Sequence, residues 1–149
     1  MRGEKLSSSL PGRKSTERGA YARRSELILD DLKTVAIIDD DPGMRESLEV
    51  LLAVMGYYAE IFDSAESFLT AAATSSASCL VVDIHLPDLS GIELARQLVA
   101  EGFNYPIIFM TGRDNDFIRR QAEATGCIAF LKKPFPAKLL RDAIRQATK

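Results

Sequence analysis

The sequence has no apolar run that approaches the roughly 20 residues needed to span a bilayer, and its first residues lack the apolar core of a signal peptide. These two absences favour a cytoplasmic protein with no membrane partner. The net charge of −2 is too small to argue for a nucleic-acid partner. Tryptophan is missing, but 46% of the 149 residues are apolar, which suffices for one domain with a single core.

Cysteine is also scarce, and the two cysteines are placed unfavourably for a disulfide. Cys79 opens one predicted strand and Cys127 precedes another. In the sheet order given below, two strand spacings separate these strands, or roughly 9–10 Å, which is more than a disulfide spans. Both thiols are therefore expected to be small buried apolar groups.

Residues 1–33 differ in composition from the rest of the chain. They carry eight Lys and Arg against five Asp and Glu, a net charge of +3, while the remainder has a net charge of −5. Few apolar residues occur over 1–24, so this stretch is predicted to be disordered. Residues 25–32 could form a short helix capped by Ser25. A plain tail and a docking or dimerisation segment both fit this composition.

From residue 34 onward, short apolar runs alternate with stretches in which apolar residues recur at helical spacing. Apolar runs of this length are typical of strands buried in a parallel sheet. Five βα units in about 115 residues imply such a sheet with helices on both faces, and right-handed crossovers favour the strand order 2-1-3-4-5. The predicted strands are 35–38, 57–62, 80–83, 106–110 and 128–131, and the predicted helices are 42–55, 65–72, 91–102, 114–125 and 136–147.

The helix predicted over 114–125 is weakly amphipathic, with Ile118 and Ala122 as its main apolar anchors. Few anchors lower local stability, which suits an element that moves. The neighbouring helices are better anchored. Their apolar residues, including Val99 and Leu139, are expected to face the core.

Acidic residues stand at the ends of two predicted strands. Asp39, Asp40 and Asp41 follow the first strand, and Asp83 ends the third. These strands are neighbours at the point where the order reverses, the edge where ligands bind open α/β sheets. Asp41 precedes Pro42 and is expected to cap the next helix. Carboxylates gathered at one edge repel one another, and Mg²⁺ offsets this, so Asp39, Asp40 and Asp83 are the predicted metal residues.

Two further strand ends indicate related chemistry. Thr111 follows the fourth predicted strand and offers a hydroxyl, and Lys133 follows the fifth and offers an ammonium. Alone, the threonine is typical of a turn and the lysine of a solvated surface. Around Asp83 they would gather a carboxylate nucleophile, a metal, a hydroxyl donor and a cation. That set suits phosphoryl transfer to a carboxylate.

On these residues, the chain from 34 to 149 resembles the receiver domain of two-component response regulators. The matching motifs are VAIIDDDPGMR, LVVDIHLPDLSGIEL, IIFMTG and AFLKKPF, each at a predicted strand end. The motif FDSAESFL and the Thr-Gly pair are most similar to receivers of FixJ-type, LuxR-class regulators. The resemblance implies the flavodoxin-like receiver fold over 34–149, preceded by an extension over 1–33.

The resemblance also implies roles for the acidic residues. Asp83 would accept a phosphoryl group from a sensor histidine kinase. Asp39 and Asp40 would hold Mg²⁺ together with Asp83, with Asp40 as the more direct ligand of the two. The backbone carbonyl of His85 would complete the protein ligands, while its side chain would tune the lifetime of the phosphoryl group.

The other signature residues receive roles from the same resemblance. Thr111 and Lys133 would bind phosphoryl oxygens, and Phe130 would be a switch aromatic that moves inward when Thr111 shifts. The bond between Lys133 and Pro134 is expected to be cis. A downstream protein would bind the face formed by the fourth helix, fifth strand and fifth helix, and phosphorylation could induce a homodimer.

Other functions fit the sequence less well. The chain could be the receiver part of a DNA-binding transcriptional regulator. A helix-turn-helix downstream of Lys149 would decide this, and the sequence shows none, so no direct nucleic-acid binding is expected. A Mg²⁺-dependent phosphohydrolase commonly has a second acid two residues after its nucleophile, where this chain has His85. We therefore expect no enzyme beyond slow self-dephosphorylation. A phosphorylation-independent adaptor is disfavoured by the complete signature, and Ser90 lacks the histidine-carboxylate pair of a hydrolase triad.

Overall fold

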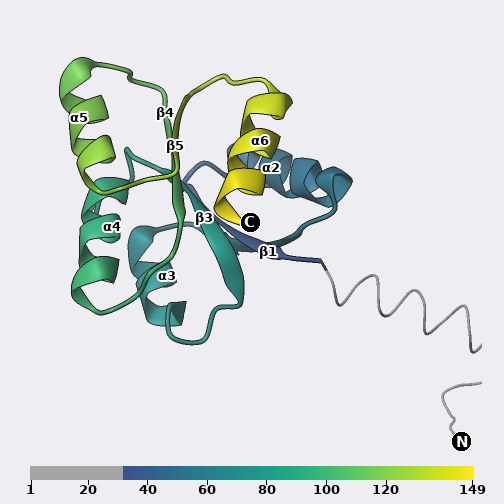
Figure 1. The fold of residues 1–149 in the computed structure, drawn as a ribbon, viewed down its shortest axis with the longest axis horizontal. Coiled ribbons are helices and arrows are strands. Elements are labelled where there is room, and N and C mark those ends of the chain that lie inside the picture. The colour runs from purple at the N-terminus through teal and green to yellow at the C-terminus, as the bar shows by residue number, and fades with distance from the viewer. Residues whose placement is uncertain (1–31) are drawn as a thin grey trace, which may run out of the picture. The chain divides into compact units, whose positions relative to one another are not determined.

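The computed structural model describes residues 32–149, and Lys33–Lys149 form one compact unit (Figure 1). The tail and short helix expected within 1–32 fall almost wholly outside the described residues. Five parallel strands form one sheet in the order β2-β1-β3-β4-β5, which confirms the predicted order. The strands are β1 (Thr34–Ile38), β2 (Tyr58–Phe62), β3 (Ala77–Asp83), β4 (Ile107–Thr111) and β5 (Ala129–Lys132).

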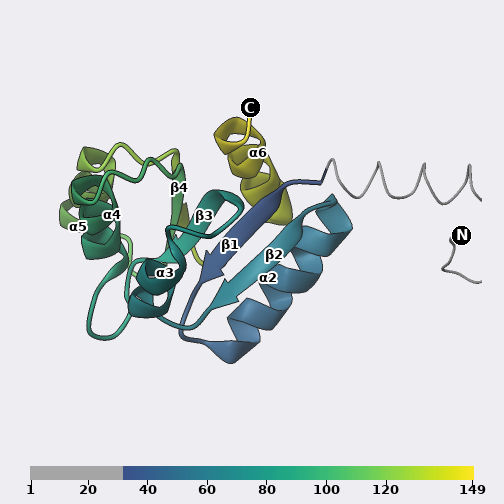
Figure 2. The same ribbon diagram turned by 90° about the horizontal axis from the view of Figure 1, so that it is seen from below.

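Helices cover both faces of the sheet, as predicted. They are α2 (Pro42–Met55), α3 (Ala65–Ala71), α4 (Gly91–Ala100), α5 (Asp116–Ala124) and α6 (Ala137–Ala147). Figure 2 shows α2 and α6 on one side of the sheet and α3, α4 and α5 on the other. Over residues 32–149, no helix combines the length and apolar character needed to cross a membrane.

The buried strands explain the continuous apolar runs in the sequence. Successive side chains of a strand point to opposite faces, and here each face has its own core. Ile38 of β1 belongs to the cluster that contains Phe68 of α3, while the adjacent Ile37 belongs to the cluster that contains Leu52 of α2. Both faces of β1 therefore need apolar residues, and alternation with polar ones disappears.

Side-chain caps mark where α2 and α5 begin. The carboxylate of Asp41 accepts the backbone N–H of Gly43 at 3.0 Å, which confirms the predicted cap of α2. The amide oxygen of Asn115 accepts the N–H of Ile118 at 2.9 Å. Because Asn115 takes the capping position, α5 begins at Asp116, two residues later than predicted.

Two core predictions were wrong. Val99 is 67% exposed and Leu139 is 48% exposed, although both were expected to face the core. In α4 the core-facing position belongs to Leu98, and in α6 it belongs to Leu140. The next or preceding residue lies about 100° round the helix, so Val99 and Leu139 turn towards solvent.

The burial of the two cysteines matches the prediction for one of them. Cys79 and Cys127 are free. Burial raises the pKa of the Cys79 thiol to about 12, whereas Cys127 is only half-buried, so its predicted burial was wrong.

In α5, Ala122 is the one fully buried residue and Ile118 packs against the core as a half-buried neighbour. The helix thus has few apolar anchors.

Candidate functional site

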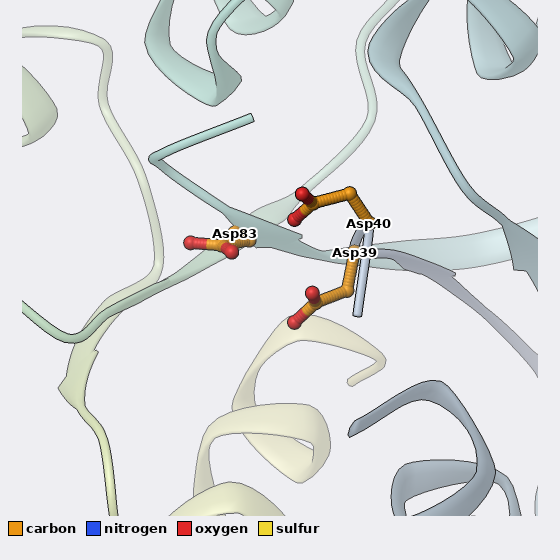
Figure 3. A group of neighbouring side chains, drawn as sticks. All are labelled: Asp39, Asp40 and Asp83. Carbon is orange, nitrogen blue, oxygen red and sulfur yellow. The ribbon is translucent and has the colours of Figure 1, made fainter. Parts of the chain in front are cut away.

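The carboxyl ends of β1 and β3 bring three carboxylates together. One oxygen from each of Asp39, Asp40 and Asp83 lies within 4.8 Å of the other two. Figure 3 shows the side chains of Asp39 and Asp40 on opposite sides of the backbone, both turned towards Asp83. Asp39 is fully buried and Asp83 nearly so, while Asp40 is exposed. The cluster is therefore open to solvent on the side of Asp40.

Lys133 supplies a positive charge to this cluster. Its Nζ lies 2.9 Å from Oδ2 of Asp39 and 3.3 Å from Oδ2 of Asp83. The residue follows β5, and its backbone N–H donates to the carbonyl of Thr111 at 2.7 Å. The bond between Lys133 and Pro134 is cis, as predicted.

Burial and pairing oppose each other in setting the protonation of these groups. Burial raises the pKa of the Asp39 carboxyl above its usual value, although hydrogen bonds from the Asp41 N–H and from Lys133 act against the rise. Burial alone would lower the pKa of Lys133, but its hydrogen bond to Asp39 and the charge of Asp83 raise it overall. Lys133 therefore remains an ammonium, and the carboxyl groups of Asp39 and Asp83 share it.

This donor set fits a hard divalent cation. The three groups offer oxygen ligands only, which suits Mg²⁺ or Ca²⁺ better than a metal that prefers nitrogen or sulfur. One ammonium leaves an excess of carboxylates, and the exposed Asp40 leaves a route for a hydrated ion.

Thr111 lies at the end of β4, next to the strand of Asp83, and is fully buried. Its hydroxyl accepts the N–H of Arg113 at 2.9 Å and lies 2.9 Å from the carbonyl oxygen of the same residue. The ring nitrogen Nε2 of His85 is 3.0 Å from this hydroxyl. The backbone N–H of His85 donates to Oδ1 of Asp83 at 3.1 Å. His85 thus contacts both Asp83 and Thr111.

Sequence reasoning missed two residues that support the site. The guanidinium of Arg45 donates to the carbonyl oxygen of Asp39 at 2.9 Å. A Cβ atom on Gly91 would lie 2.5 Å from the carbonyl oxygen of Asp83, so this position admits only glycine without a backbone shift. Both residues stand in the motifs VAIIDDDPGMR and LVVDIHLPDLSGIEL, which was the available signal.

Phe130, the predicted switch aromatic, lies in β5 and is half-buried. The guanidinium of Arg119 stacks over its ring, 4.6 Å from the centroid, and also pairs with Asp114 at 2.7 Å. The ring therefore connects β5 with α5.

Ser90 has a structural use. Its hydroxyl accepts the N–H of Glu93 at 3.1 Å, and the Glu93 carboxylate accepts the N–H of Ser90 at 3.0 Å. This reciprocal pair is a capping box at the start of α4, in keeping with the lack of triad partners.

Comparison with known proteins identifies the family. A model of the response regulator receiver domain matches residues 35–145. The chain belongs to this family. The transcriptional regulatory protein FixJ of Bradyrhizobium diazoefficiens is 38% identical over 117 residues, which are 76% of this chain and 57% of FixJ. The response regulator protein TodT of Pseudomonas putida is 36% identical over 120 residues, 80% of this chain and 53% of TodT.

Solved structures agree with that assignment. The crystal structure of FixJ-N has 35% identity and a TM-score of 0.72, covering 78% of this chain and 93% of that one. Full-length FixJ from B. japonicum has 39% identity and a TM-score of 0.70, covering 77% of this chain and 59% of that one. The chain thus spans little more than half the length of the curated relatives it matches.

Proposed function

We propose that Asp83 is the phosphoacceptor of a two-component signalling pathway and takes its phosphoryl group from a phosphohistidine of a sensor kinase. The observation that carries the proposal is the position of Lys133, whose ammonium contacts both Asp39 and Asp83, two of the three carboxylates that cluster at this edge. A buried carboxylate held by a cation and next to further acidic ligands suits attack on phosphorus. Residues 34–149 would form the receiver domain.

In the transfer, a carboxylate oxygen of Asp83 forms a bond to phosphorus as the bond between phosphorus and the kinase imidazole breaks. The electron pair of that bond leaves with the imidazole. Lys133 remains protonated and balances charge on the phosphoryl oxygens, and the hydroxyl of Thr111 donates to one of them. The N–H of His85, already bound to Oδ1 of Asp83, fixes the orientation of the carboxylate.

Mg²⁺ fits the same site. Asp39, Asp40, Asp83 and the carbonyl of His85 would hold the ion, and when bound it supplies the positive charge that a phosphoryl group requires beside three carboxylates. The oxygen-only donor set and the exposed approach at Asp40 support this assignment.

We place the protein among phosphoacceptors and not among phosphohydrolases. The position two residues after Asp83 holds His85, whose ring is bound to Thr111. A second carboxylic acid at this position would activate a water molecule. The imidazole of His85, which stands there instead, is engaged with Thr111. Self-dephosphorylation is therefore expected to be slow. We also propose that the protein is cytoplasmic.

The kinase must cover the sheet edge that carries Asp83. An apolar groove of about 420 Å³ lies beside Lys133, between α2 and the loop that follows β5. We assign kinase docking to this groove, because a partner seated there reaches the acidic cluster directly. Its lining residues are Met44, Ser47, Leu48, Leu51, Lys133, Pro134 and Phe135.

The downstream partner would bind the face formed by α5, β5 and α6. Phe117 of α5 is 62% exposed, and α5 has one fully buried residue, so this face is both accessible and weakly anchored. A homodimer formed on phosphorylation would use the same face. The charged residues of the face formed by α5, β5 and α6 are Arg119, Arg120, Lys132 and Arg141. Ordinary solvation explains their presence there equally well.

A second candidate use follows from the relatives. FixJ is named a transcriptional regulatory protein and is considerably longer than the matched region. The chain could therefore be the receiver part of a DNA-binding regulator. In that case the phosphoryl chemistry is unchanged, and residues 34–149 alone would not bind DNA.

Intact mass after incubation with acetyl phosphate and Mg²⁺ tests the proposed function. The wild type should gain one phosphoryl group, and Asp83→Asn should gain none. Chelation of Mg²⁺ should abolish the gain in the wild type. Equal gain in both proteins would place the acceptor elsewhere. No gain, either from acetyl phosphate or from a phosphorylated histidine kinase, would favour a phosphorylation-independent adaptor.

A further inference from the structure

His85 is the chain's one histidine, and its two halves contact two different residues of the site. The backbone N–H donates to Oδ1 of Asp83 at 3.1 Å, and ring atom Nε2 lies 3.0 Å from the hydroxyl of Thr111. The ring is therefore placed to act on Thr111 while the backbone acts on Asp83.

The hydroxyl of Thr111 has no free proton to donate. A hydroxyl has one proton and two lone pairs, and this one has three partners within 3.0 Å: the N–H and the carbonyl of Arg113, and Nε2 of His85. The side chain is fully buried. Its proton goes either to the Arg113 carbonyl or to His85, and in both arrangements it is engaged.

A phosphoryl oxygen on Asp83 can only accept that proton after the hydroxyl leaves one of these partners. Two of the three contacts come from the backbone of Arg113, so His85 is the one side chain among them. Resting and phosphoryl-bound arrangements of Thr111 are thus two states, and any contact present in only one of them shifts the balance.

We propose that His85 is a positioning residue that holds Thr111 in its resting orientation, so that a phosphoryl group must displace the hydroxyl from the imidazole. The inference rests on the proposed function, in which Thr111 binds a phosphoryl oxygen. Because Thr111 is also bonded to the backbone of Arg113, release by His85 moves the segment that leads into the Asn115 cap of α5. His85 therefore sets how readily the α5 face responds.

The test compares His85→Leu, which fills the space without a hydrogen bond, with His85→Gln, whose amide nitrogen can replace Nε2. Each is titrated with beryllofluoride, a phosphoryl mimic, at saturating Mg²⁺, and binding is followed by NMR. We expect His85→Leu to lower the half-saturating concentration about three- to tenfold, the effect of one net hydrogen bond. His85→Gln should stay close to wild type.

The same two variants are then measured in a Thr111→Ala background, where the hydroxyl is absent. There His85→Leu should have no effect, since a double-mutant cycle isolates the interaction between the two side chains. An unchanged or raised half-saturating concentration for His85→Leu would overturn the proposal, as would an equal effect with and without the hydroxyl. Mg²⁺ affinity, measured alone, should be the same in all variants.

Failure of the proposed function is read separately, from the wild type. If the wild type neither binds beryllofluoride nor gains a phosphoryl group at Asp83, the receiver chemistry fails and the role of His85 falls with it. If the wild type does both and the cycle shows no coupling, only the role of His85 is wrong.

Discussion

Lys133 and Asp39 form an ion pair at 2.9 Å, although 94 residues separate them in the sequence. Their strands are not neighbours, because β3 and β4 lie between β1 and β5. The lysine side chain therefore reaches along the carboxyl edge of the sheet and contacts Asp83 on the way. The Lys133 side chain thus links the acidic ends of β1 and β3 to β5, the strand at one edge of the sheet.

Replacing this lysine should destabilise the fold when no metal is present. Lys133→Met leaves two buried carboxylates without their cation, and we expect a loss of about 1–3 kcal/mol in the free energy of unfolding. The pKa of Lys133 is raised above 10.5 in the folded state, so its contribution is fully present below that pH and declines as the pH passes the folded value. Urea unfolding in a chelator at pH 7 to 9 should show a constant difference from wild type.

The neighbouring Lys132→Met is the matched control for that measurement. Lys132 is exposed, so its loss should change the free energy of unfolding by less than about 0.5 kcal/mol. Equal effects of the two variants would mean that the ion pair with Asp39 contributes nothing.

Asp39→Asn should have the opposite effect. Burial raises the pKa of the Asp39 carboxyl, so the folded state binds this proton more tightly than the unfolded state does. The stabilisation that this bound proton gives the folded state is present below the ordinary carboxyl pKa of 3.8. It is lost as the pH rises through the raised pKa of Asp39. Without metal, Asp39→Asn should therefore be more stable than wild type at pH 7, with a smaller difference at pH 3.

Urea unfolding at several pH values measures this effect, and Asp40→Asn is the control. Asp40 is exposed, so its neutralisation should stabilise the fold less. The idea is wrong if Asp39→Asn is less stable than wild type at neutral pH, because the ion pair with Lys133 would then outweigh the cost of burial.

Gly91→Ala should destabilise the fold by about 1–3 kcal/mol. The new Cβ would meet the carbonyl oxygen of Asp83 at 2.5 Å, and neither backbone can move without shifting the loop between them. Gly43→Ala is the matched control, because its Cβ would have an ordinary contact at 3.5 Å within a helix. That change should be neutral or stabilising by up to about 1 kcal/mol. Chemical denaturation of both variants decides the matter.

The proposed kinase groove can be tested separately from the chemistry. Ser47 is exposed on α2 and lines the groove, so Ser47→Glu would place a charge where an apolar partner packs. Transfer from a phosphorylated histidine kinase should fall at least about fivefold, as for an interface residue worth 1 kcal/mol or more. The rate with acetyl phosphate should not change.

Val50→Glu serves as the comparison, because Val50 is 60% exposed on α2 and does not line the groove. It should leave both rates at the wild-type level. If both variants slow the kinase reaction equally, the docking surface is broader than the groove or lies elsewhere on α2.

The sequence alone determined the elements and the strand ends. Apolar runs and helical spacing located all five strands and five helices, because burial on both faces of a parallel sheet leaves a local pattern. Asp39, Asp40, Asp83, Thr111 and Lys133 were predicted at the carboxyl edge for the same reason: each ends an apolar run or lies within two residues of its end, so its place at that edge follows from the order of the strands.

The tertiary structure decided what depends on distance between separate segments. It buries Asp39 and exposes Asp40, although they are adjacent, and it turns Val99 towards solvent. It also joins the ring of His85 to Thr111. Helix rotation and side-chain reach are set by packing against elements distant in the sequence, and no local pattern records them. The sequence therefore specified which groups meet at this edge, and packing specified which of them touch.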